Sequence, residues 1–179
     1  MRLLFIGLMG AVSICSSQDR SDEQACLALT DVPDLSIASA TIRRTNPGAK
    51  PYCYVKGSVP PGIRYHVQLP LPGDWNGRFL HWGDGGLDGD LDFADHRVRQ
   101  GYAVANSNLG HDAGSEPGYS FAFNSKQAEI DYGYRAVHVT VIAAKTLIRA
   151  YYRRPARYSY HEGYSTGGRE GFILKTAVE

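Results

Sequence analysis

The stretch Gly163–Gly168 is the sequence pattern with the clearest chemical meaning. It reads Gly-Tyr-Ser-Thr-Gly-Gly and places Ser165 in the arrangement G-x-S-x-G. Residues 156–162 predict a strand before this turn, and residues 169–178 predict a helix after it. In such a context the small flanking residues permit a sharp, strained turn that exposes the serine hydroxyl. The pattern predicts a nucleophilic serine, with the Thr166 N–H at the helix start as an oxyanion donor.

Two other interpretations apply to the same turn. A phosphate-binding P-loop would need Lys followed by Ser or Thr, but Arg169 and Glu170 stand at these positions. Both phosphate-handling groups are therefore missing, and this interpretation is rejected. A glycine-rich turn whose serine only caps the following helix remains an alternative.

A second glycine-rich loop spans residues 83–90, directly after a short apolar run. Gly85 and Gly86 are candidates for the other oxyanion donor, because backbone N–H groups of such loops complete the oxyanion hole of hydrolases. The loop lacks the third glycine of a dinucleotide fingerprint. It also fails as a calcium loop, since Phe93 replaces the glycine and Arg99 the bidentate glutamate. No metal site is expected, and a plain surface turn remains an alternative.

The six histidines all precede Ser165 in the chain. In α/β-hydrolases the triad order is Ser, acid, His, yet only 14 residues follow this serine. His111 is expected in a loop near the site, where it supports the site or touches substrate. His138, near the apolar stripe of a helix, is expected to pack or to form a hydrogen bond, and His161 is too close in sequence to reach the serine.

Periodicity predicts the elements that must position these residues. Residues 63–69 alternate apolar and polar side chains, and an Asn-Gly turn signal at 76–77 joins this strand to the apolar run 79–80. A further strand is predicted at 101–106, and apolar residues spaced three and four apart over 130–151 predict a long helix. The order strand, helix, strand, turn, helix predicts an α/β fold with a mostly parallel sheet flanked by helices.

Composition limits the classes of protein that this chain can represent. The 179 residues are 43% hydrophobic and 21% charged, which fits one folded domain and excludes disorder. The net charge is +1, so nothing favours nucleic acid or an anionic membrane as a partner.

The N-terminal residues predict export. Arg2 precedes the apolar run 3–14, which is too short to span a membrane and typical of a secretory signal. We predict a signal peptide over 1–17, a mature domain over 18–179 without membrane contact, and a secreted or periplasmic location. A lipoprotein signal at Cys15 is the weaker alternative, because Ile14 stands where a small residue is needed.

Cleavage of that leader would leave Cys26 and Cys53. An even number of cysteines in an exported chain indicates a disulfide that ties the N-terminal segment to the strand region. Two unrelated buried thiols remain the alternative.

A set of short motifs, in this order along the chain, resembles the tannase and feruloyl esterase family, from about Cys26 to Glu179. The motifs are Pro51-Tyr52-Cys53, Trp75-Asn76-Gly77-Arg78-Phe79, the loop Gly83 to Gly89, Gly101-Tyr102-Ala103-Val104, Gly110-His111-Asp112, Asp131 to His138 and Gly163 to Arg169. The family, which includes mono-hydroxyethyl terephthalate hydrolase, consists of secreted α/β-hydrolase serine esterases. Their large lid domain binds the aromatic acid and often a structural calcium ion.

The resemblance implies roles for residues identified above. Ser165 matches the nucleophile, the loop at Gly85 and Gly86 the first oxyanion donor, and Thr166 the second. Cys26 and Cys53 match a family disulfide.

Two departures from the family pattern affect these expectations. The family usually carries a cysteine before its serine, bonded to one before the catalytic histidine, and Tyr164 stands there instead. The sequence given ends at Glu179, so the lid, the acid, the histidine and any calcium site have no counterpart. We expect an N-terminal third of the enzyme, incomplete at the C-terminus and without a cofactor of its own.

The resulting hypothesis is a carboxylic ester hydrolase that acts on small aromatic esters, feruloyl, galloyl or related, through an acyl-enzyme on Ser165. The chain alone is expected to be inactive. A non-catalytic remnant without a base is the first alternative. The second is a secreted binding module that uses the tyrosine-rich surface.

Overall fold

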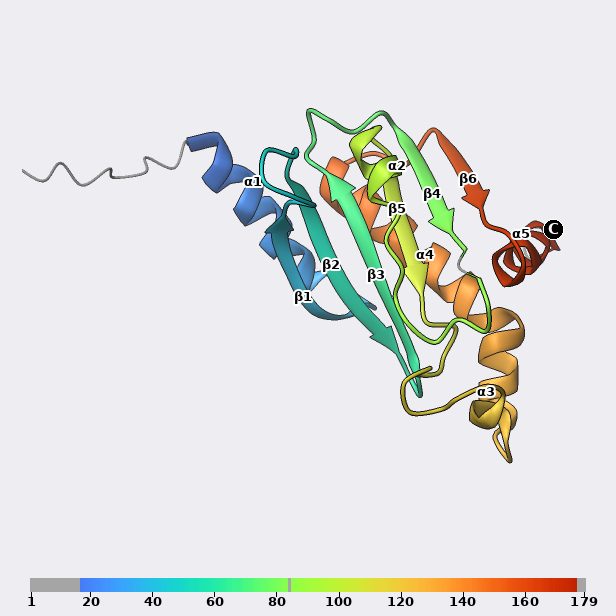
Figure 1. Ribbon diagram of the computed structural model, residues 1–179. Coiled ribbons are helices and arrows are strands. Elements are labelled where there is room, and N and C mark those ends of the chain that lie inside the picture. The colour runs from blue at the N-terminus through green and yellow to red at the C-terminus, as the bar shows by residue number, and fades with distance from the viewer. Residues whose placement is uncertain (1–16, 84, 177–179) are drawn as a thin grey trace, which may run out of the picture.

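A six-stranded sheet forms the centre of the computed structural model, which describes residues 17–83 and 85–176 (Figure 1). The strand order is β1-β2-β3-β5-β4-β6. The strands are β1 Ser36–Arg43, β2 Tyr52–Val59, β3 Ile63–Pro70, β4 Arg78–Trp82, β5 Ala103–Ser107 and β6 Tyr158–Glu162. The α-helices are α1 Ser17–Leu27, α2 Asp95–Arg99, α3 Lys126–Ile130, α4 Ala136–Tyr152 and α5 Thr166–Thr176. Single turns of 3-10 helix at Ala28–Asp31 and Ser120–Ala122, and of π-helix at Asp131–Arg135, complete the described elements.

The described sheet is mixed, with parallel pairing confined to β5, β4 and β6. β1 pairs antiparallel with β2, β2 with β3, and β3 with β5. The expected α/β-hydrolase-type sheet flanked by helices is present, but the prediction of mostly parallel pairing holds only for this one half. The reason is the connection length: the three residues 60–62 between β2 and β3 permit only a hairpin, whereas a parallel neighbour needs a long crossover.

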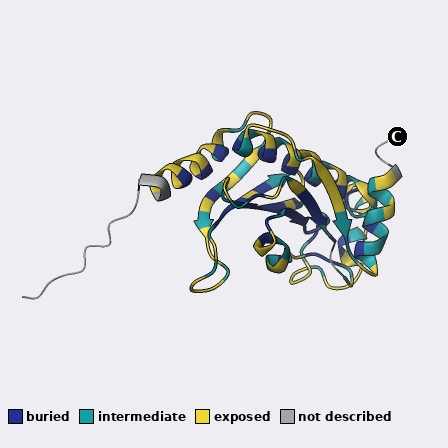
Figure 2. Ribbon diagram, turned by 90° about the horizontal axis from the view of Figure 1, so that it is seen from above, coloured by how far each residue is buried: buried dark blue, intermediate teal, exposed yellow. Residues whose placement is uncertain are grey.

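The helices cover both faces of the sheet. α4 lies behind the sheet and α2 in front of it, while α1 and α5 lie beyond opposite edges (Figure 1). The apolar residues of α4 are spaced three and four apart, which places them on one face of the helix. This face packs against apolar side chains of the strands. Buried members of this core are Val55, Val67, Phe79, Ala103, Ala105, Ala143, Ala144, Leu147 and Ile148. The central strands β2, β3, β4 and β5 accordingly form the buried centre of the molecule (Figure 2).

The strand predictions differ from the structure in two ways. The strands predicted at 63–69 and 79–80 are present as β3 and β4, but they are not partners, because β5 lies between them. The Asn-Gly turn leads into β4, with Gly77 at a φ of 81°. β1 and β2 were not predicted from the sequence. β2 is buried on both faces over most of its length, so it shows no alternation.

The predicted disulfide between Cys26 and Cys53 is confirmed. It joins α1 to β2, with 5.6 Å between the two Cα atoms and both side chains fully buried. Residues 1–16 of the predicted signal peptide lie outside the described residues. Within residues 17–83 and 85–176, no helix combines the length and the apolar character needed to cross a bilayer.

Candidate active site

Ser165 occupies the sharp turn between β6 and α5. Its φ is 55°, a left-handed conformation that a non-glycine residue rarely adopts, and the residue is exposed. The helix begins at Thr166, three residues earlier than predicted, despite the poor helix propensity of the glycines that follow. The Ser165 carbonyl accepts the first helical hydrogen bond, from the Arg169 N–H at 3.2 Å. The sequence motif therefore folds into the strand–turn–helix that it predicts.

The glycines of this turn are required by close backbone approach. A Cβ at Gly163 would lie 2.7 Å from the carbonyl carbon of Gly167. A Cβ at Gly83, in the second glycine loop, would lie 2.8 Å from the Cα of Gly167. Real Cβ atoms do not approach backbone atoms so closely, so any side chain at these positions would push the turn apart.

The second glycine loop packs directly against the serine turn. The Gly83 N–H donates to the Glu162 carbonyl at 2.9 Å, and the Thr166 hydroxyl donates to the Gly86 carbonyl. Gly85 faces the ring of Tyr164, whose nearest atom would lie 3.6 Å from a Cβ at this glycine. The structure thus brings the four predicted residues Ser165, Thr166, Gly85 and Gly86 to one end of β4 and β6.

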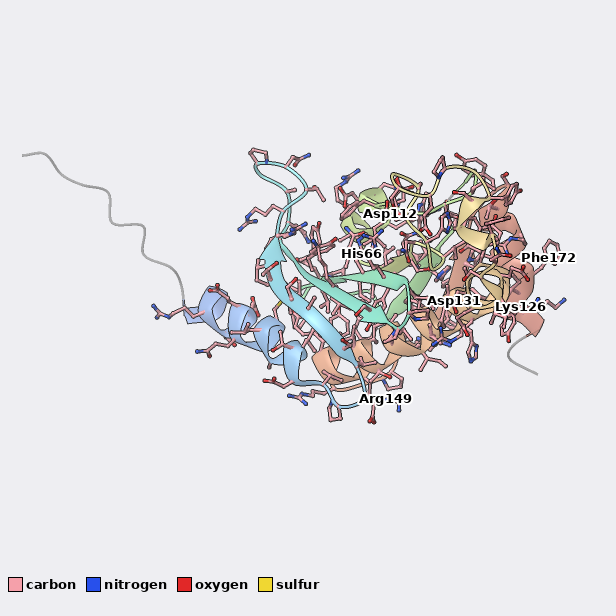
Figure 3. All side chains as sticks on the ribbon, turned by 90° about the horizontal axis from the view of Figure 1, so that it is seen from below. His66, Asp112, Lys126, Asp131, Arg149 and Phe172 are labelled. Atoms are coloured by element: carbon pink, nitrogen blue, oxygen red, sulfur yellow. A yellow bond between two sulfur atoms is a disulfide. The ribbon has the colours of Figure 1, made fainter. Side chains whose placement is uncertain are left out.

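Tyr164, which stands at the position of the family cysteine, is 75% exposed. One edge of its ring faces Gly85, and the remainder lies open to solvent. Phe172 on α5 is equally exposed, and it projects outward from that helix (Figure 3). The end of the sheet that carries the turn therefore presents aromatic surface.

Arg169 anchors the start of α5 to the π-helical turn. Its guanidinium donates to the carbonyls of Tyr132 at 2.9 Å and Gly133 at 3.2 Å, and it lies 4.3 Å from the Tyr132 ring centroid. Both hydrogen bonds come from Nη1, and a guanidinium suits this position because it can donate in its plane while its face stacks on a ring. No role for Arg169 was predicted from the sequence, although the residue belongs to the family motif.

A histidine pair, with His81 buried and His161 half-buried, lies beneath the turn. Nδ1 of His81 on β4 is 3.2 Å from Nδ1 of His161 on β6, and Nε2 of His161 is 2.6 Å from the Gly167 carbonyl oxygen. Burial lowers the pKa of His81 to about 3 and also lowers the pKa of His161. His161 therefore points away from Ser165, as expected, but the pairing itself was not predicted.

His111 lies under the glycine loop and not beside the serine. It is buried, with its ring stacked on Phe121 at 4.0 Å and edge-on to Tyr132 at 5.9 Å. A Cβ at Gly89 would lie 2.7 Å from His111 Nε2, so the ring directly supports the end of the loop. Burial lowers the pKa of His111.

A pocket of about 650 Å³ lies on the other side of His111. Arg64 and Asp112 form an ion pair of 2.7 Å at its wall, and Phe123 lines it. Figure 3 shows Asp112 and Asp131, both of which border this pocket. Ser165 is not among the lining residues.

The described part of the chain supplies no general base to Ser165. The serine side chain has no hydrogen-bond partner among these residues, and the remaining histidines are engaged or distant. His66 contacts the Tyr54 hydroxyl at 3.1 Å, and His96 packs edge-on against Trp82. His138 is exposed on α4, so the packing role considered for it is not found. No group of three or more His, Cys, Asp or Glu side chains in the described residues is arranged to hold a metal ion.

Comparison with known proteins identifies the family. The sequence profile described as tannase and feruloyl esterase matches residues 42–176. This chain belongs to the tannase and feruloyl esterase family. An uncharacterized esterase of Agrobacterium fabrum is 31% identical over 185 aligned positions, which cover 93% of this chain and 33% of that protein. A probable feruloyl esterase B-2 of Aspergillus flavus is 36% identical over 115 residues, covering 63% of this chain and 21% of that protein.

Solved structures of the family share the fold. The crystal structure of feruloyl esterase B from Aspergillus oryzae superposes with a TM-score of 0.71 at 26% identity, over 84% of this chain and 33% of that one. The tannin acyl hydrolase from Aspergillus niger matches in fold, with a TM-score of 0.61 at 19% identity. The chain spans between about a fifth and a third of the length of the relatives named here.

Proposed function

We propose that this chain contributes the nucleophile and the oxyanion hole of a secreted carboxylic ester hydrolase. The observation that carries the proposal is the exposed Ser165 at a φ of 55°, held between β6 and α5 against the glycine loop. A strained turn of this kind presents a hydroxyl to substrate while the helix start presents N–H groups. The family membership supports an esterase, and the buried disulfide suits an oxidising compartment.

The proposed reaction is acyl transfer through Ser165, which the exposed turn supports. The Ser165 hydroxyl attacks the ester carbonyl carbon as a base accepts its proton, which gives a tetrahedral oxyanion. The Thr166 N–H and a backbone N–H of Gly85 or Gly86 stabilise the oxyanion. The alcohol leaves with the proton, and water then hydrolyses the acyl-enzyme. We assign the base and the acid to residues outside the described part, because none of the described histidines partners Ser165.

An aromatic acyl group is the proposed substrate class. Relatives carry the names feruloyl esterase and tannin acyl hydrolase, and exposed Tyr164 borders the glycine loop here. The small aromatic ester is the only partner proposed, and the described residues are assigned no cofactor. A lid with structural calcium would belong to a part of the enzyme beyond this chain.

The test starts by reading the frame downstream of Glu179 and expressing the complete product. We expect hydrolysis of methyl ferulate or methyl gallate, with a fluorophosphonate probe attached to Ser165. Ser165→Ala should lower the turnover of the ester by about 10⁴-fold or more. The same substitution should prevent labelling by the probe. Ser115→Ala, in an exposed turn, is the matched control and should leave both unchanged.

Two outcomes would contradict the proposal. A product that neither hydrolyses esters nor reacts with the probe would indicate a non-catalytic remnant. Affinity for aromatic acids that survives Ser165→Ala, without turnover, would indicate a binding module.

A further inference from the structure

The geometry of the pair His81–His161, in which His81 is buried and His161 half-buried, fixes where its protons lie. The two rings are nearly parallel, with centroids 5.4 Å apart, an interplanar angle of 21° and the two Nδ1 atoms 3.2 Å apart. On the other side of His161, Nε2 lies 2.6 Å from the Gly167 carbonyl oxygen. A carbonyl can only accept, so His161 Nε2 must carry a proton.

The rest of the proton arrangement follows in sequence. With Nε2 protonated, a neutral His161 has a bare Nδ1, which accepts. His81 must then donate from its own Nδ1. The pair therefore exists as the Nε2–H form of His161 and the Nδ1–H form of His81. Protonation of His161 at Nδ1 would point two N–H groups at each other and break this contact.

Three glycines form the seat of the His161 ring. A Cβ at Gly83 would lie 2.8 Å from its Cε1, and a Cβ at Gly171 would lie 2.7 Å from its Cδ2. The third, Gly167, supplies the carbonyl. These glycines come from the glycine loop and from α5, so one ring contacts the glycine loop and the first turns of the nucleophile helix together.

We propose that His81 and His161 are positioning residues, which in their neutral state hold the Gly167 carbonyl and thereby fix the first turn of α5. This role rests on the proposed function, because that turn carries Ser165 and the Thr166 N–H. Neither histidine touches substrate. The pair acts by setting the distance between the serine turn and the glycine loop, to which oxyanion stabilisation is sensitive.

The charged groups around the pair come from three elements. Glu170 Oε2 on α5 lies 3.8 Å from His81 Nδ1, beyond hydrogen-bond distance, and Glu162 follows His161 on β6. Lys145 on α4 and Lys175 on α5 line an adjoining pocket of about 310 Å³. The acids favour charge on the imidazoles and the lysines oppose it. Complete burial of His81 outweighs the acids, so the pair stays neutral near pH 7.

The primary test is nitrogen-15 NMR of the histidine rings in the chain as it stands, at about pH 7.5 and pH 5. The expected result is the Nε2–H form for His161 and the Nδ1–H form for His81 at the higher pH. The opposite tautomer of His161, or a charged ring at that pH, would overturn the proposal. This readout needs no ester turnover, so it stands apart from any failure of the proposed function.

Hydrogen exchange of the amides of residues 166–171 tests the positioning role. His161→Leu should accelerate exchange there about fivefold or more relative to β3, because the half-buried hydrogen bond to the Gly167 carbonyl is lost. His161→Gln keeps a donor for Gly167 and an acceptor for His81, so exchange should stay near wild type. Because protonation of His161 breaks its contact with His81, we expect acidification to accelerate exchange at residues 166–171 relative to β3 in wild type, and we expect no such response in His161→Gln.

His138→Gln, on the exposed face of α4, is the matched control and should match wild type at both pH values. If His161→Leu, His161→Gln and His138→Gln all exchange alike at residues 166–171, the proposal is wrong. If His161→Leu does not fold, the tautomers of wild type and the pH response of His161→Gln still decide it.

Discussion

Gly163 shows how closely the backbone packs at the serine turn. A methyl group at this position would lie 2.7 Å from the carbonyl carbon of Gly167, so one of the two segments must move. We expect Gly163→Ala to lower the free energy of unfolding by about 2 kcal/mol, as overpacking of a tight site does. Urea unfolding of the purified chain measures the change.

Gly73→Ala provides the comparison for this substitution. A Cβ at Gly73 would have open space around it, and this glycine has no positive φ. Gly73→Ala should therefore raise the free energy of unfolding by about 0.5 kcal/mol, because alanine lowers the conformational entropy of the unfolded chain. Equal stability of the two variants would show that the turn yields to a side chain more easily than its geometry indicates.

His66 gives the chain a stability that depends on pH. The residue lies fully buried on β3, against Tyr54 and Phe93, and burial lowers its pKa to about 4 (Figure 3). Its unfolded pKa is about 6.5, so the unfolded chain binds a proton first as the pH falls. Stability should therefore be constant above about pH 7 and fall between about pH 6.5 and pH 4, by about 2 kcal/mol at pH 5 for this residue.

His66→Gln isolates that contribution. His81 adds a loss of the same sign, because burial lowers its pKa to about 3. The decrease in unfolding free energy between about pH 8 and pH 5 should be smaller in His66→Gln than in wild type by about 2 kcal/mol. Parallel curves for the two proteins would mean that His66 takes up its proton without unfolding.

The residues of the site differ in how well sequence predicts them. The candidate residues Ser165, Thr166, Gly85 and Gly86 lie in two short motifs, so their types and spacing carry the information. His81 and His161 do not, because they meet only through the register of β4 against β6. Each of the two histidines, taken alone, resembles any other strand residue in its local sequence. No local pattern predicts that they pair across β4 and β6.

At the scale of elements, the elements predicted from the sequence are those whose apolar residues recur at a regular spacing. β3 is almost entirely buried, but polar and apolar residues alternate along it, and α4 carries an apolar stripe at helical spacing, so both periods are visible in the sequence. β2 is buried on both faces and β1 lies at the sheet edge with mixed exposure. α1 is polar along its length, and its place is set by a disulfide that periodicity does not show.

The disulfide between Cys26 and Cys53 is expected to hold α1 on the sheet. It closes a loop with a sequence separation of 27 residues, and the loop-entropy relation gives about 3 to 4 kcal/mol of stabilisation. The double variant Cys26→Ala/Cys53→Ala should unfold at a correspondingly lower urea concentration. Reductant should shift wild type in the same direction and leave the variant unchanged.

Peptide mapping without reductant provides a separate check of this bond. Recovery of both cysteines as free thiols from exported protein would contradict the bond itself. An intact bond with no loss of stability in the variant would instead show that α1 stays in place without it.

At the scale of the whole molecule, the distribution of the histidines predicts the activity of this chain alone. No described histidine partners Ser165, so residues 18–179 should hydrolyse methyl ferulate at least about 10⁴-fold more slowly than the complete gene product. A side-by-side assay at equal serine concentration measures the ratio. Fast hydrolysis by residues 18–179 that is abolished by Ser165→Ala would contradict this prediction. His111 would then be the candidate general base.

The strand order also has a consequence for how the chain is made. β4 needs β6 as its outer neighbour, yet the paired His81 and His161 are 80 residues apart. A ribosome adding about 5 to 20 residues per second needs about 4 to 16 seconds to bridge that interval. Throughout it, Phe79 and Leu80 belong to an unpaired strand edge that can recruit other nascent chains. The turn that carries Ser165 forms only when β6 closes this edge, so we expect the protection of β4 during synthesis to limit the yield of folded protein.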